Sequence, residues 1–184
     1  MVKHFLDSTD DDWLLMLDAD ERISSDTFKL LCDTAHSIDR PVVSGLYFAA
    51  LWEDLNLRPV PVIFHATEDK GIQPIDDYPK DSIIKIDGAG TGCLLMHRSA
   101  LKKIRDASPE DHRDWCWFQD GPIGGNKWLS EDLTFCSRLK DNDIPMYAHT
   151  GAILQHSKRM WLDSPHHDAW LRDNPAGTGL EQLQ

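Results

Sequence analysis

The sequence has few cysteines and no long uninterrupted run of apolar residues. Its four cysteines are spread over 184 residues, and none forms a CxxC pair. This spacing argues against a zinc ribbon and favours buried free thiols. No apolar run approaches the ~20 residues that a membrane-spanning helix needs. We therefore expect a protein with no membrane span.

Basic residues are also scarce relative to acidic ones. The chain has 19 lysines and arginines against 31 aspartates and glutamates, which gives a formal net charge of −12. Binding to a nucleic-acid backbone requires clustered lysine and arginine, so this balance argues against a nucleic-acid partner. An anionic ligand such as a diphosphate would be repelled unless a cation mediated its binding. The acidic N-terminal stretch lacks the pattern of a secretory signal, so we expect a cytoplasmic location.

The remaining pattern is typical of one α/β domain. The apolar run 13–17 indicates a strand buried on both faces of a largely parallel sheet. Residue spacing predicts helices over 26–37, 99–105 and 130–140, and strands over 13–17, 42–51, 59–65, 83–86, 93–97, 145–149 and 153–156. We expect irregular segments over 66–82 and 106–129. Residues 1–160 would form the domain, and residues 161–184 a C-terminal arm or lid.

The apolar run Trp13–Leu17 leads directly into two carboxylates, Asp18 and Asp20. A parallel sheet binds ligands just beyond the carboxyl ends of its strands, which is where these carboxylates would lie. If the chain is still extended there, residues i and i+2 point the same way and the two carboxylates converge. A divalent cation would relieve their repulsion, because hard cations prefer oxygen ligands. The alternative is an ordinary polar turn.

Two further segments carry groups that suit a site. The glycine-rich turn that includes Gly90 and Gly92 would let a ligand approach the backbone, or would simply make a tight turn. It is not a dinucleotide-binding fingerprint, because it leads into a strand. Glu131 and Asp132 fall in the first turn of a predicted helix. Carboxylates there complement the helix dipole, or one of them serves as a general base towards a hydroxyl.

His156 ends the last predicted strand. A lone histidine there is either structural or part of a cation site with Asp20. Mixed nitrogen and oxygen ligands would suit Mn²⁺. A metal-dependent hydrolase that uses Asp18, Asp20, His149 and His156 is a further hypothesis.

Taken in order, these segments resemble the GT-A-type nucleotide-sugar glycosyltransferases, specifically the family 2-like group. The strand that ends in Asp18-Ala19-Asp20 looks like the DXD motif. Residues 90–98 look like the family's glycine-rich strand with its following basic residue, and residues 130–136 look like the ED motif. His156 falls where the late metal-binding histidine is expected. The resemblance covers roughly residues 10–160 and implies a GT-A-like mixed, mainly parallel sheet flanked by helices.

The resemblance also implies a role for each matched residue. Asp18 would contact the nucleotide ribose or a metal-bound water. Asp20 and His156 would hold Mn²⁺ or Mg²⁺ on the diphosphate of a nucleotide-sugar donor, and the metal would neutralise the leaving group. Asp132, with Glu131 beside it, would deprotonate the acceptor hydroxyl. The reaction would invert the anomeric centre.

The acceptor would be a glycan or another hydroxyl compound, bound near Trp115, Trp117 and the segment 66–82. The family has several strands and helices ahead of its DXD motif, whereas 17 residues precede Asp18 here. The resemblance therefore implies an N-terminally truncated form. A second copy or a partner chain would cover its exposed sheet edge. A non-catalytic module that binds a glycan or a protein is the competing hypothesis.

Overall fold

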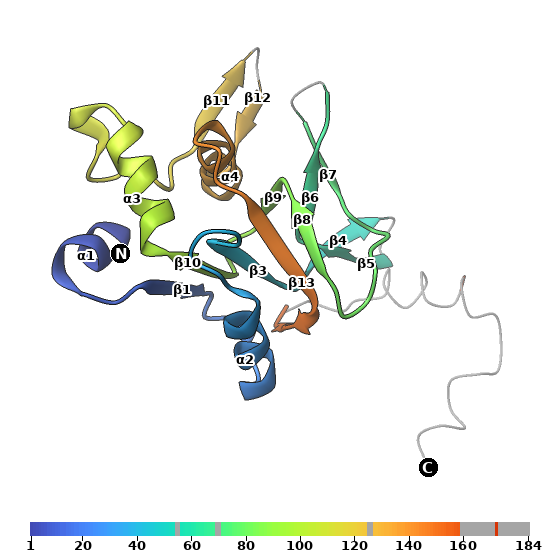
Figure 1. Cartoon of the computed structure of the whole chain (residues 1–184). Coiled ribbons are helices and arrows are strands. Elements are labelled where there is room, and N and C mark those ends of the chain that lie inside the picture. Colours follow the sequence, from blue (N-terminus) through green and yellow to red (C-terminus); the bar gives the residue numbers. More distant parts are fainter. Residues whose placement is uncertain (54–55, 69–70, 125–126, 159–171, 173–184) are drawn as a thin grey trace.

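The computed structural model describes residues 1–53, 56–68, 71–124, 127–158 and 172, and every structural statement below concerns these residues. Their fold is mixed α/β (Figure 1). The helices are α1 (Val2–Ser8), α2 (Ser25–Thr34), α3 (Arg98–Ala107) and α4 (Glu131–Asp141), with a 3₁₀ turn at Glu110–His112. The central sheet contains, in spatial order, β1 (Trp13–Leu17), β10 (Cys93–His97), β3 (Val42–Leu46), β13 (Met146–Ile153) and β8 (Ile83–Ile86).

The central sheet is mixed, and the expected mainly parallel, GT-A-like sheet is not confirmed. Strands β3 and β13 run parallel, whereas the other three neighbouring pairs are antiparallel. The expectation rested on taking the apolar run of β1 for a strand buried on both faces. β1 instead lies at the edge of the sheet, where it pairs with β10. Its residues are half-buried or exposed, because an edge strand is covered on one side only.

Helices cover both faces of the central sheet (Figure 1). Successive residues of a strand point to opposite faces, so each strand supplies two cores. Val42 and Leu46 of β3 join the larger core, which α1, α3 and α4 cover. Val43 and the following Tyr47 join the smaller core, which Leu31 of α2 covers.

Short strands form small sheets around the central one. Two hairpins pair β4 (Phe48–Glu53) with β5 (Asn56–Pro61), and β11 (Gly121–Gly124) with β12 (Lys127–Leu129). A three-stranded sheet contains β7 (Ile72–Pro74), β6 (Ile63–Ala66) and β9 (Gly88–Ala89), and a two-stranded sheet pairs β2 (Glu21–Arg22) with β14 (Gln155–His156). The predicted strand 42–51 thus divides at Tyr47 into β3 and β4, and both segments predicted as irregular contain short strands.

Several predictions from residue spacing are confirmed. The three predicted helices lie within a few residues of α2, α3 and α4, and β1 and β10 have the predicted bounds. All four cysteines are free, and three of them are buried, whereas Cys32 is exposed.

Among the described helices, none has the length and apolar character needed to cross a bilayer. The predicted arm over 161–184 lies outside the described residues except at residue 172.

Candidate functional site

The pairing of β2 with β14 brings two predicted site segments together. In this antiparallel pair His156 lies opposite Glu21. The backbone N–H of Ser157 also donates a hydrogen bond to the carbonyl oxygen of Asp20, at 2.8 Å. These contacts hold Asp20 beside His156, although the two residues are 136 positions apart in the sequence.

The imidazole ring of His156 is held at both nitrogens. Nδ1 lies 2.8 Å from the carbonyl oxygen of Phe48, and it must carry the proton because a carbonyl only accepts. Nε2 lies 3.2 Å from Oδ2 of Asp20. The side chain is 11% exposed. Metal-binding histidines commonly have this arrangement, in which one nitrogen donates to a carbonyl and the other is turned to the ion.

Asp20 has a second neighbour, the ammonium group of Lys158. Nζ of Lys158 lies 3.2 Å from Oδ2, the same oxygen that His156 approaches. The hydrogen bond from Lys158 is the main cause that lowers the pKa of Asp20, and the positive charge of Lys158 adds to it. The side chains of Asp20 and Lys158 are 49% and 42% exposed, so water screens this ion pair.

Glu21 is the anomalous group of this cluster. Its side chain is fully buried, and neither carboxylate oxygen has a hydrogen-bond partner among the described residues. The Nδ1 atom of His156 lies 3.5 Å from Oε1. Burial raises the pKa of Glu21, because a poorly solvated carboxylate resists ionisation. The only signal for Glu21 in the sequence is its place directly after the DXD-like motif.

An open cavity of about 700 Å³ is lined by residues 19–22 and 155–158. Its lining sets two carboxylates, Asp20 and Glu21, beside the basic side chains of Arg22, His156 and Lys158. Asp18 does not line this cavity. Within the described part of the chain, no group of three or more His, Cys, Asp or Glu side chains is placed to hold one metal ion. A cation here would therefore have Asp20 and His156 as its protein ligands.

The second predicted motif lies at the N-terminus of α4. Both of its carboxylates, Glu131 and Asp132, fall in the first helical turn, where they complement the helix dipole. Oγ1 of Thr91 donates a hydrogen bond to Oδ1 of Asp132, at 2.6 Å. Because Thr91 belongs to the glycine-rich turn, the fold joins these two predicted segments.

Tyr47 contacts both the glycine-rich turn and His156, and it is a site residue that the motifs do not include. Its hydroxyl accepts a hydrogen bond from the backbone N–H of Gly92, at 3.1 Å. Its ring packs edge-on against that of His156, with centroids 5.4 Å apart. Burial raises the pKa of Tyr47, and three carboxylates raise it further: Asp132, Glu21 and Asp18. Tyr47 follows β3 directly and has no motif around it, so no sequence signal pointed to it.

Close packing against Tyr47 accounts for both predicted site glycines, Gly90 and Gly92. A Cβ added to Gly90 would lie 2.2 Å from the hydroxyl oxygen of Tyr47 and 2.8 Å from Cγ1 of Val62. A Cβ on Gly92 would lie 2.7 Å from Cζ of Tyr47. Both glycines are therefore needed for internal packing, and their contact with a nucleotide stays a prediction.

Four other residues that the sequence analysis named lie away from the Asp20 cavity. Trp117 is buried and its Nε1 donates to the carbonyl of Leu101, so the prediction that it lines an acceptor site is wrong. Trp115 is exposed. The guanidinium of Arg98 donates to backbone carbonyls at the end of α1. His149 is buried in β13, accepts a hydrogen bond from its neighbour Gly151, and does not line the cavity.

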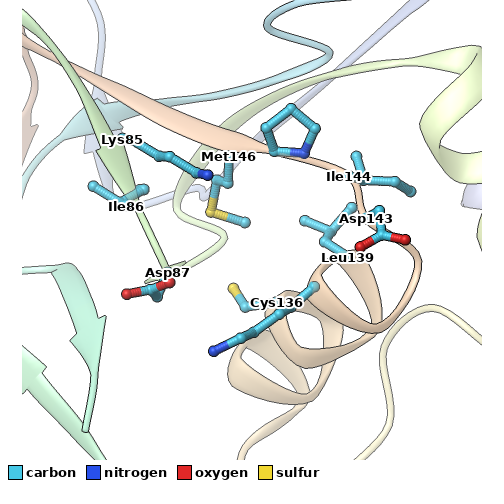
Figure 2. A pocket seen from close by; sticks show the side chains of 10 residues that line it. Lys85, Ile86, Asp87, Cys136, Leu139, Asp143, Ile144 and Met146 are labelled. Carbon is cyan, nitrogen blue, oxygen red and sulfur yellow. The ribbon is translucent and has the colours of Figure 1, made fainter.

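A separate cavity of about 410 Å³ lies between α4, β8 and the start of β13 (Figure 2). Cys136 is the nucleophilic group in its lining, and its Sγ lies 3.4 Å from both the backbone N and O of Ala89. Burial raises the pKa of this thiol to about 12. The thiol therefore stays protonated at neutral pH and is a poor nucleophile. This cavity brings no groups to the Asp20 cluster.

No family model and no curated protein matches this sequence. Among solved structures, the crystal structure of A197 from STIV superposes on the chain with a TM-score of 0.48 and 20% sequence identity. The alignment covers 86% of this chain and 64% of A197, so the chain spans less than two thirds of that protein. A similarity of this degree assigns neither a family nor a function.

Proposed function

We propose that the chain carries out metal-dependent transfer of a sugar from a nucleotide-diphosphate donor to an acceptor hydroxyl, or forms the catalytic half of an enzyme that does. The observation that carries this proposal is the approach of His156 Nε2 to Asp20 Oδ2, at 3.2 Å, beside an open cavity. An imidazole nitrogen with a carboxylate oxygen suits Mn²⁺, and Mg²⁺ is the alternative.

The surroundings of His156 support its role as a ligand. Because Nδ1 is engaged by the Phe48 carbonyl, Nε2 is the ring nitrogen that faces Asp20 and would coordinate a cation. A bound divalent cation would supply the positive charge that offsets the diphosphate leaving group. Two protein ligands would leave the other coordination positions to water and phosphate oxygens, as is usual for Mg²⁺ with nucleotides.

Asp132 is the proposed general base. Oδ1 is oriented by Thr91, and we assign Oδ2 the task of accepting the proton of the acceptor hydroxyl. Glu131 lies beside it in the same helical turn. Attack opposite the departing diphosphate would invert the anomeric centre. Asp132→Asn is expected to lose turnover while it keeps nucleotide binding.

The first test is thermal melting with Mn²⁺ alone and then with Mn²⁺ plus UDP, GDP, CDP or ADP. We expect one nucleotide to stabilise the protein only when Mn²⁺ is present, by about 2.7 kcal/mol at a hundredfold excess over its dissociation constant. Asp20→Ala should abolish this shift. Asp33→Ala is the matched control, since it removes an exposed carboxylate that does not line the cavity. Stabilisation that survives in Asp20→Ala would contradict the proposal.

A second candidate is a non-catalytic module that binds a glycan or a protein. It is favoured by the internal partners that both acidic motifs already have, Lys158 for Asp20 and Thr91 for Asp132. It predicts a thermal shift with a glycan and none with Mn²⁺ and any nucleotide.

Under either candidate, a second copy or a partner chain paired with the edge strand β1 is a proposal that sedimentation analysis can test.

A further inference from the structure

Lys158 places an ammonium group where a metal ion would approach Asp20. Its Nζ lies 3.2 Å from Oδ2 of Asp20, and Nε2 of His156 lies 3.2 Å from that same oxygen. All three side chains belong to residues that line the open cavity. Oδ2 of Asp20 thus faces both the Nε2 atom of His156, which is a suitable metal ligand, and the ammonium group of Lys158.

The backbone explains why Lys158 reaches this position. β14 ends at His156, and the N–H of Ser157 is bonded to the Asp20 carbonyl. Lys158 is the next residue, so the backbone bond at Ser157 places the Lys158 side chain beside Asp20. The lysine side chain is nevertheless 42% exposed, so it can leave the carboxylate for the cavity without disturbing packed groups.

We propose that Lys158 is an exchangeable counter-ion, which neutralises Asp20 while no metal is bound and turns to the diphosphate of the donor once a divalent cation displaces it. The inference rests on the proposed function, because it takes Asp20 and His156 as the ligands of that cation. A divalent ion outcompetes a screened ammonium at a carboxylate. The displaced ammonium then remains in the same cavity, where a phosphate oxygen is its natural partner.

The test is calorimetric titration of the full chain with Mn²⁺ alone, for the wild type, Lys158→Met and a matched control. Lys29→Met is the control: it makes the same change of charge at an exposed ion pair with Asp33, outside the cavity. We expect Lys158→Met to bind Mn²⁺ more tightly, by up to about fivefold, since an exposed ion pair competes only modestly. Lys29→Met should bind Mn²⁺ as the wild type does, and Lys158→Arg should restore the competition.

A second titration measures UDP, GDP, CDP and ADP at saturating Mn²⁺. Here the expected sign reverses, and the nucleotide that binds the wild type should bind Lys158→Met several-fold more weakly. Equal Mn²⁺ affinity of the wild type and Lys158→Met would overturn this inference and leave the proposed function standing. Unchanged nucleotide affinity would overturn the contact with the diphosphate. Absence of Mn²⁺ binding by every variant would overturn the proposed function as well.

Discussion

The two acidic motifs of this protein differ in what surrounds them. Asp20 faces a histidine nitrogen and an ammonium group beside an open cavity. Asp132 accepts a hydrogen bond from the neutral hydroxyl of Thr91 and lies in the first turn of α4. On our proposal a divalent cation would displace Lys158 from Asp20, whereas the partner of Asp132 is a hydroxyl with no charge for a cation to displace. The difference favours a metal ligand in the first motif and a positioned base in the second.

Neighbours of both motifs contact one buried ring, that of Tyr47. Tyr47 contacts His156 on the side of the first motif and Gly92 on the side of the second. We therefore expect the packing around this ring to contribute more to stability than the hydrogen bond of Asp132 or the buried charge of Glu21. Three substitutions test this contrast, and the change in stability that we expect decreases from the first to the third.

Gly90→Ala should have the largest effect. The added methyl group would clash with the hydroxyl of Tyr47 and with Val62, and overpacking of this kind costs about 2–3 kcal/mol of unfolding free energy. Urea denaturation measures the change. Gly121→Ala is the control, because its Cβ would meet Thr134 at an ordinary 3.8 Å. Equal losses of unfolding free energy in the two variants would show that the packing of Gly90 against Tyr47 is no tighter than the packing at Gly121.

Thr91→Val should have an intermediate effect. The valine keeps the shape of the threonine but removes the hydrogen bond to the Asp132 carboxylate, so we expect a loss of about 1.5 kcal/mol in urea denaturation. Thr91→Ser keeps a hydroxyl and should lose much less. If the valine and serine variants are equally stable, Thr91 does not orient Asp132 and the contrast between the motifs weakens.

Glu21→Gln should have the smallest effect, and it should be stabilising at neutral pH. Burial raises the folded-state pKa of Glu21 above its unfolded value, so the folded chain binds this proton more tightly. The resulting penalty is absent below the unfolded pKa and grows as the pH rises through the folded pKa. Removal of the buried charge should therefore add about 1 kcal/mol at pH ~7 and nothing at low pH.

Urea denaturation at several pH values measures this dependence, with the exposed Glu68→Gln as the control. The control should follow the wild type at every pH. A loss of stability in Glu21→Gln at neutral pH would mean that the buried carboxylate stabilises the fold as a charge partner of His156. Oε1 of Glu21 lies 3.5 Å from Nδ1 of His156.

Local pattern was enough for the three longer helices and for some of the strands. The bounds of β1 and β10 and the approximate extents of α2, α3 and α4 follow from apolar runs and helical spacing, which act over a few residues. Strand direction was not accessible in this way. An apolar run looks the same whether its neighbours run parallel or antiparallel, so β1 was taken for a strand buried on both faces when it is an antiparallel edge strand.

The sequence by itself determined which groups are present and in what order: Asp18 and Asp20 after a strand, the glycine-rich turn, the acidic start of α4, and His156 at the end of a strand. Tertiary structure alone decided their partners. The β2–β14 register set Asp20 against His156 and brought Lys158 to the same oxygen. It also buried Glu21, which has no hydrogen-bond partner within the described part of the chain. These outcomes depend on contacts between residues more than a hundred positions apart, and local spacing carries no information about them.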